Sequence, residues 1–130
     1  MTKRLLMGLI LVMTATAAMA EWTRVDSSDE FILYVDRATI IRNGHLVKMW
    51  GLYDLKTVQT GAAGDSYLSD KAQSEYDCKE EKVRTLALIF FSGQMGNGKV
   101  VYSDSDTMKW IPVPPGSFGA TLWKIACGKK

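Results

Sequence analysis

The chain has 130 residues, of which 47% are hydrophobic and 23% charged, with 16 basic and 14 acidic residues. This length suits a single domain. The near balance of charge excludes the broad basic surface that nucleic-acid-binding proteins carry, and no Lys/Arg cluster is present to bind anionic lipid.

The first twenty residues are predicted to be a secretory signal peptide. Two basic residues at positions 3 and 4 precede an apolar stretch over residues 5–17, and the AMA sequence at 18–20 places small residues before the next position. This is the layout of a cleavable export signal, with cleavage expected between Ala20 and Glu21. The apolar stretch is shorter than the about 20 residues that a membrane span needs.

Export sets the expected location of the mature chain. Residues 21–130 form the predicted domain, which holds 14 basic and 14 acidic residues once the signal peptide is removed. No cysteine follows the apolar stretch, so no lipid anchor is expected. The mature chain is therefore predicted to be periplasmic or secreted, or associated with the cell surface, and to have no transmembrane segment.

The first half of the domain is predicted to consist of strands. Residues 22–25 and 31–35 are runs of β-forming residues, and one helical turn is expected around residues 37–39. Asn43-Gly44 is expected at the two central positions of a type I′ hairpin turn. The alternating sequence at 45–56 predicts the longest strand.

The next segments are predicted to be a loop and two strands. Residues 57–66 are rich in Gly and Ala and predict a mobile loop. Residues 82–93 are the most apolar and predict a central strand that is covered on both faces. Between them, residues 67–78 predict a strand with one wet face, formed by Ser69, Lys71, Gln73 and Glu75.

The end of the chain predicts a turn, a strand, an extended segment and a helix. The glycine-rich residues 93–99 predict a hairpin turn, residues 99–103 a strand, and the proline-rich residues 110–115 an extended segment. A short helix is expected to begin after Ser117 as N-cap and to end at Gly128. The expected fold is α+β: one antiparallel sheet of about six strands with a C-terminal helix packed on one face.

The two cysteines, Cys78 and Cys127, admit three interpretations: a disulfide, a pair of metal ligands, or a nucleophile. An even count in an exported chain favours a disulfide. A structural zinc site needs four ligands, and the only other candidate is His45. A nucleophile needs a nearby base, and His45 lies in an expected hairpin turn. The sequence therefore predicts a Cys78–Cys127 disulfide and no catalytic set, no metal site and no cofactor.

Three further features carry weaker predictions. Asp104 and Asp106 have the D-x-D spacing that can begin a calcium site, although Asp and Ser are also ordinary turn residues. The glycine-rich turn at 93–99 lacks the spacing of a phosphate-binding loop. Trp110, in the proline-rich segment, is the aromatic residue selected as a candidate for partner binding, because Trp is common in binding hot spots. Packing in the core is the alternative for Trp110.

Several segments resemble the surface-adhesin protein E family of Gram-negative bacteria. They are EYDCKEEKVRTLALIFFSG, GKVVYSDSD, the proline-rich WIPVPPGS and LWKIACGK, together with YVDRATIIRNGHLVKMWGLYDLK upstream. The resemblance covers nearly the whole mature chain. It implies a curved antiparallel sheet whose C-terminal helix is tied to the concave side by a disulfide, with Cys78 and Cys127 at the matching positions.

The resemblance also implies a function. The founding member of the family is an outer-membrane lipoprotein that binds host extracellular-matrix and serum proteins and can dimerise. The first hypothesis is thus a non-enzymatic envelope protein that binds a protein partner, or a second copy of itself, through its sheet or an edge strand. The alternative is a small periplasmic carrier that holds an apolar or aromatic ligand between sheet and helix. A cavity at that interface distinguishes the two hypotheses.

Overall fold

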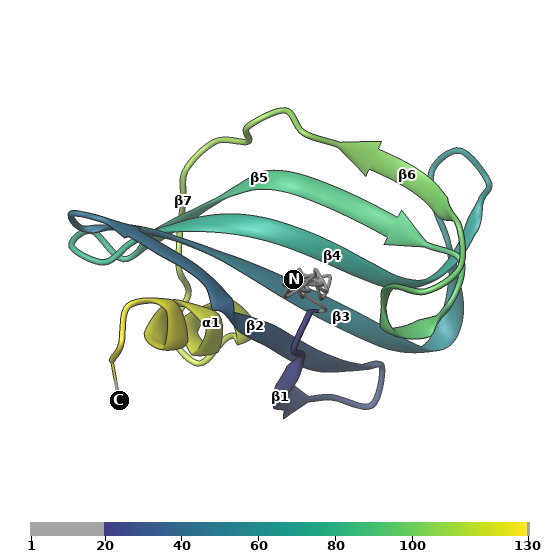
Figure 1. Ribbon diagram of the computed structural model, residues 1–130, viewed down its shortest axis with the longest axis horizontal. Helices are drawn as coiled ribbons and strands as arrows, with labels where there is room; N and C mark the ends of the chain where they lie inside the picture. Colours follow the sequence, from purple (N-terminus) through teal and green to yellow (C-terminus); the bar gives the residue numbers. More distant parts are fainter. Residues whose placement is uncertain (1–19, 130) are drawn as a thin grey trace, which may run out of the picture.

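A computed structural model describes residues 20–129, so residues 1–19 of the expected signal peptide lie outside the described residues. The chain folds as an antiparallel sheet in which six strands follow one another in chain order (Figure 1). A two-residue strand also pairs with the fifth strand, beyond the end of the sixth. The elements are β1 (Thr23–Ser27), β2 (Phe31–Asn43), β3 (Leu46–Thr60), β4 (Ser66–Asp77), β5 (Lys82–Phe91), the 3₁₀ turn η1 (Gln94–Gly96), β6 (Val100–Asp104), β7 (Ile111–Pro112) and α1 (Phe118–Ala126).

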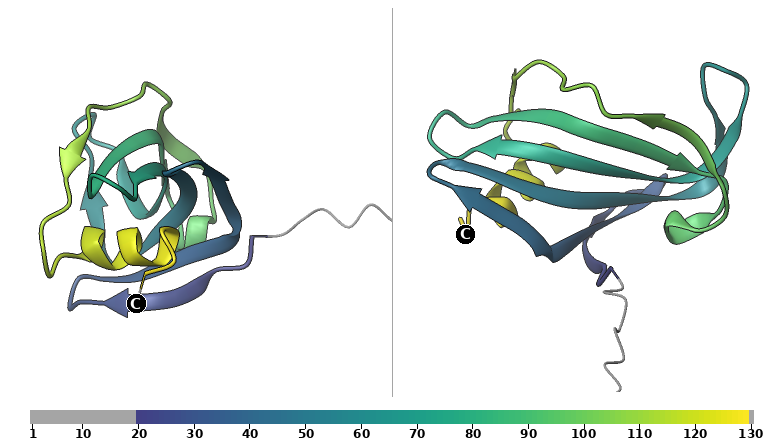
Figure 2. Two further views of the ribbon diagram at one scale, coloured as in Figure 1. Left: turned by 90° about the vertical axis from the view of Figure 1, so that its left-hand side faces the viewer. Right: turned by 45° about the horizontal axis from the view of Figure 1, so that its top comes forward.

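The sheet is curved, and α1 packs inside the curve at one end (Figure 2). The predicted signals for α1 are confirmed. Ser117 is the N-cap and its Oγ accepts a hydrogen bond from the Ala120 amide at 3.1 Å, while Gly128 follows the helix with φ of +66°. A nine-residue helix is marginal alone, so its stability must come from packing on the sheet.

The face of the sheet that carries α1 is called the helix face, and the other is the opposite face. The helix face holds the main core, where apolar residues of β2, β3 and β4 pack against α1. Alternation along each strand sends every second side chain to this face. Its buried members are Leu33, Val35, Val47, Met49, Tyr76, Leu122, Trp123, Ala126 and Cys127.

The prediction of a helical turn around residues 37–39 is wrong. The chain stays in β2, and the register with β3 shifts between Asp36 and Ile41. Side chains hold this bulge: Asp36 Oδ1 accepts from the Ala38 amide, and Thr39 Oγ1 donates to the Asp36 carbonyl while accepting from the Trp50 amide. The short polar side chains of Asp36 and Thr39 thus satisfy backbone groups at a β-bulge.

The β2–β3 hairpin forms where it was predicted, but its turn is displaced by one residue. Asn43 pairs with Leu46, so the two central residues are Gly44 and His45. Gly44 has φ of +64°, whereas His45 is not among the described residues with positive φ. Glycine at the first central position is the pattern of a type II′ turn, and not of the expected type I′.

Two predictions about β3 and β4 are wrong. Strand β3 continues to Thr60, so the expected loop shrinks to the turn at 61–65. Ser69 and Glu75, expected on a wet face, are 0% and 6% exposed. Ser69 is covered by the loop at 93–99, because its Oγ donates to the Gly93 carbonyl and accepts from the Gly96 amide.

The apolar composition of β5 predicted a central strand, and this prediction is wrong. The middle of the sheet is formed by β3 and β4, and β5 lies next to the edge occupied by β6 and β7. Most side chains of β5 are half-buried, and only Phe91 is fully buried. The apolar residues of β5 therefore leave accessible surface on the sheet. Within residues 20–129, no helix has the length and apolar character to cross a membrane.

Candidate functional site

The interface between α1 and the sheet is closed. Cys127 forms a disulfide with Cys78, with their Cα atoms 5.6 Å apart, which confirms the predicted link. Trp123 Nε1 donates to the Asp77 carbonyl at 2.9 Å, directly beside Cys78. Leu122 and Trp123 are at most 9% exposed. These contacts fill the interface around Leu122, Trp123 and Cys127, which disfavours the alternative hypothesis of a carrier site between sheet and helix.

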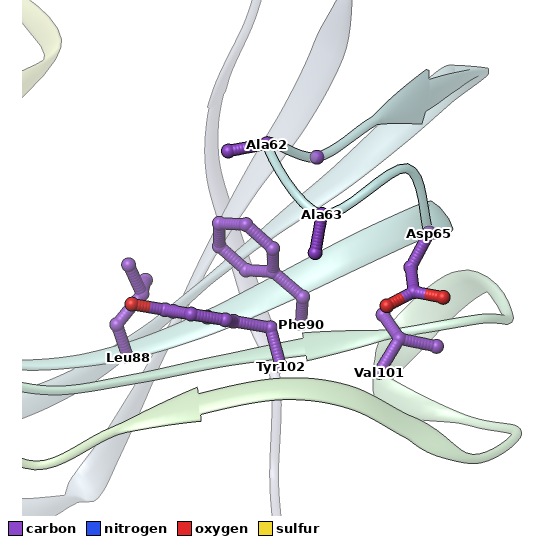
Figure 3. Close-up of a pocket in the computed structure, with 8 residues that line it drawn as sticks. Ala62, Ala63, Asp65, Leu88, Phe90, Val101 and Tyr102 are labelled. Atoms are coloured by element: carbon purple, nitrogen blue, oxygen red, sulfur yellow. The ribbon is translucent and has the colours of Figure 1, made fainter.

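A hollow of about 330 Å³, drawn in Figure 3, lies instead at the end of the sheet with the β3–β4 turn, far from α1 in Figure 1. We call it the tip hollow. It lies between the turn at 61–65 and strands β5 and β6, and Phe90 and Tyr102 form its floor. Figure 3 shows Ala63 directed from the turn toward the space above these two rings. Its lining residues are Gly61, Ala62, Ala63, Asp65, Leu88, Phe90, Val101 and Tyr102.

Strand register brings the aromatic residues of the tip hollow together. Phe90 pairs with Tyr102 across β5 and β6, so both side chains lie on one face of the sheet. Their rings are 5.2 Å apart, and Tyr67 stacks on Phe90 with centroids 4.3 Å apart. Phe90 also pairs with Asp70, which pairs with the core-packed Tyr53, so the hollow is on the helix face.

The turn that covers the hollow is short, and most of its side chains are small. The Gly61 amide donates to the Asp65 carbonyl at 2.8 Å, and Gly64 has φ of +84°, a conformation that glycine adopts without strain. The alanines of this turn add little bulk, so they leave room over the aromatic rings. The glycine- and alanine-rich sequence therefore creates an apolar recess at the sheet end.

One wall of the hollow is an edge strand. Strand β6 pairs only with β5 among the described residues, so its outer edge is unpaired. Tyr102 is 45% exposed and Val100 is 55% exposed on this strand. A strand with an unpaired outer edge can bind an extended chain by main-chain pairing. The adjacent apolar recess can then hold one side chain of that bound chain.

Asp70 lies on the same face, between the core and the tip hollow. Burial raises the pKa of its carboxyl to about 6, because the charged form loses hydration. Burial also raises the pKa of the Tyr53 phenol, and the Asp70 charge adds to this effect. The raised pKa distinguishes Asp70 from an ordinary exposed carboxyl on this face of the sheet.

Asp70→Asn should stabilise the protein above pH 7. The raised pKa means that the folded state favours the protonated carboxyl, so folding costs free energy once Asp70 is ionised. We expect the free energy of unfolding to rise by roughly 2 kcal/mol at pH 7.5. This gain should decrease as the pH falls from 6 to 4, and it should be absent below about pH 4. Urea unfolding of both proteins across this pH range measures it. Asp65→Asn, at an exposed position, is the control, and an equal gain at pH 3.5 and 7.5 would contradict the prediction.

The other candidate residues do not converge on a site. His45 lies in the β2–β3 turn with its side chain 59% exposed, and its Nε2 is 3.9 Å from Asp77 Oδ2. Asp104 accepts hydrogen bonds from the Asp106 amide at 2.8 Å and from the Tyr102 hydroxyl at 3.3 Å. Within residues 20–129, no three His, Cys, Asp or Glu side chains group in a way that fits a metal ion.

Trp110 lies half-buried just before β7, with the Arg84 guanidinium 4.5 Å from the centre of its ring. Arg84 in turn donates to Glu75. Trp110 thus packs on a charged pair, and its role in partner binding stays a prediction. The residues of the expected cleavage site, Ala20 and Glu21, lie before β1.

Sequence reasoning missed the residues of the tip hollow. Phe90 and Tyr102 belong to different strands, Tyr67 stacks on Phe90 from a third strand, and the turn at 61–65 was treated only as a loop. A usable signal was present in β5, because an apolar strand that lies near an edge must leave part of its surface uncovered. Finding it required the strand order.

The chain matches the model of the surface-adhesin protein E family over residues 22–128. No curated protein gives a significant match. Two solved structures of Haemophilus influenzae protein E align with TM-scores of 0.62 and 0.60, each at 13% identity over 85% of this chain and over 97% and 92% of theirs. Protein E from non-typeable Haemophilus influenzae aligns with a TM-score of 0.57 at 12% identity, over 85% of this chain and 86% of that one. At this identity the structures establish the shared fold, and the match over residues 22–128 shows that the chain belongs to the surface-adhesin protein E family.

Proposed function

We propose that this chain is an exported, non-enzymatic envelope protein that binds a protein partner at the tip hollow. Membership of a family of surface adhesins supports an adhesin-like surface role. The observation that carries the binding site is the exposed Tyr102 on β6, whose outer edge is unpaired among the described residues, beside a 330 Å³ apolar recess. Export follows from the signal peptide at 1–20, with cleavage before Glu21.

The geometry favours an extended partner segment with a large apolar side chain. Main-chain groups of β6 would pair with the segment, and its side chain would enter the recess over Phe90 and Tyr102. A recess of this size is at the lower end of ligand pockets, so it suits one large side chain. The apolar lining, with Asp65 at the rim, favours an aromatic or aliphatic group.

Variants of the hollow test this function. Tyr102→Ala removes the exposed ring, and Ala63→Trp fills the recess. We expect each to reduce partner binding at least tenfold, or by about 1.4 kcal/mol. The measurement is quantitative capture from envelope extract, followed by biolayer interferometry with the captured protein, and sedimentation reports whether the partner is a second copy.

Matched controls separate the hollow from the general surface. Met108→Ala removes a side chain that is 44% exposed, against 45% for Tyr102, and it does not line the hollow. Thr57→Trp adds the same bulk as Ala63→Trp at an exposed position outside the recess. If the controls weaken binding as much as the hollow variants, the proposed site is wrong.

A further inference from the structure

Asp36 is a buried carboxylate on the opposite face of the sheet. It is 5% exposed, and its two oxygens accept hydrogen bonds from backbone amides: Oδ1 from Ala38 at 3.1 Å and Oδ2 from Glu21 at 3.3 Å. A buried carboxylate is costly unless a positive charge compensates it. The side-chain ion pairs of residues 20–129 are Glu75 with Arg84 and Asp77 with His45, and Asp36 takes part in neither.

A lysine in the same cavity does not fill this role. Asp36 and Lys71 both line a hollow of about 450 Å³ on the opposite face. The Lys71 ammonium lies 5.0 Å from the ring centre of Phe91 and 5.6 Å from that of Trp22, and it makes no ion pair within 4 Å of Asp36. Lys71 therefore faces the aromatic walls, and the charge that compensates Asp36 must come from elsewhere.

We propose that signal-peptide cleavage supplies the missing cation. Water adds across the Ala20–Glu21 peptide bond, so that Ala20 leaves as a carboxylate and the Glu21 nitrogen becomes an α-ammonium. That nitrogen is 3.3 Å from Asp36 Oδ2, which is within ion-pair distance. A hydrogen bond from a neutral amide thus becomes a part-buried ion pair in the processed chain.

The ion pair fixes the new N-terminus on the sheet. Trp22, the next residue, lines the hollow beside Lys71, and β1 begins at Thr23. Anchoring Glu21 therefore holds Trp22 in the wall of the hollow and the edge strand β1 in place. The precursor lacks the charge, so it gains less stability from this contact than the exported product does. The inference rests on the proposed cleavage before Glu21.

Blocking the α-amino group of the purified processed protein tests the inference. Acetylation of Glu21 recreates the neutral amide and keeps its N–H, so only the charge is lost. In the unfolded chain an α-amino group titrates near 8 and lysine near 10.4, so reagent at mildly acidic pH in urea modifies the terminus preferentially. The protein is then refolded with its disulfide intact, and intact mass confirms one acetyl group. We expect acetylation to lower the Tm by about 5 °C or more.

Variants identify the partner of the charge. In Asp36→Asn, acetylation should change the Tm by less than about 2 °C. Asp29→Asn, at an exposed position in the turn between β1 and β2, should respond to acetylation like the native chain. Equal sensitivity to acetylation with and without Asp36, or no sensitivity in the native chain, would overturn the ion pair. If Lys71→Gln abolishes the effect of acetylation on the Tm, the effect depends on Lys71 and not on an ion pair with Asp36.

N-terminal sequencing of the exported chain keeps the two proposals apart. A terminus at Glu21 with no effect of acetylation contradicts the ion pair alone. A terminus at another residue contradicts the cleavage site, and the ion pair with it. Partner capture at the tip hollow, on the other face of the sheet, is independent of both results.

Discussion

Removing the disulfide should lower the Tm of the protein by roughly 15–25 °C. The bond joins residues 49 positions apart, and its loss frees that loop in the unfolded chain. On the chain-entropy view this costs about 4 kcal/mol, a large share of the about 5–15 kcal/mol that stabilises a typical domain. The variant to test is Cys78→Ala/Cys127→Ala, because alanine leaves no polar group in the buried site of Cys127.

The loss should be concentrated at α1. The helix has nine residues, and its hydrogen bond from Trp123 to the Asp77 carbonyl lies directly beside the Cys78–Cys127 bond. Thermal melts followed by circular dichroism, together with hydrogen exchange of residues 118–126, measure both effects. The native chain in dithiothreitol should melt like the double variant, and dithiothreitol should not change the double variant. A double variant with an unchanged Tm would show that packing alone holds α1.

The sequence predicts those parts of the fold whose causes are local. Ser117 and Gly128 bound α1 because a cap and a left-handed stop act within a few residues. The pairing of Cys78 with Cys127 is not local, and it could be predicted because the sequence has two cysteines and so one possible pair. The meander order was not predicted, since β5 was expected to be central and lies next to the edge occupied by β6 and β7.

Features that depend on distant residues could not be predicted. The bulge after Asp36 is stabilised by Thr39 Oγ1, which accepts from the Trp50 amide 11 residues later. Ser69 is buried because the Gly96 backbone, 27 residues away, folds over it. The tip hollow and the contact between Glu21 and Asp36 likewise join segments whose proximity is set only by the assembled sheet.

Arg84→Met should destabilise the protein by about 2–4 kcal/mol. Arg84 donates from Nε and from a terminal nitrogen to Glu75 Oε1, at 2.8 and 2.6 Å, and the Glu75 side chain is only 8% exposed. Methionine keeps much of the length of arginine but leaves the Glu75 charge buried without its partner. The Arg84 side chain is 30% exposed, so water partly screens the pair and the effect falls below that of a fully buried one.

A double-variant cycle separates the charge from the packing. Glu75→Gln/Arg84→Met should recover at least half of the loss, because no uncompensated carboxylate remains, and the remainder reports the contact of Arg84 with the Trp110 ring. Arg24→Met is the control, since Arg24 is exposed and its NH2 group donates only to Ser27 Oγ, so it should change stability by less than about 0.5 kcal/mol. Urea unfolding at pH 7 compares the native chain, Glu75→Gln, Arg84→Met, the double variant and the Arg24→Met control. If the double variant is as unstable as Arg84→Met, then the buried charge is not the cause, and the stacking of Arg84 on Trp110 carries the stability of this edge of the sheet.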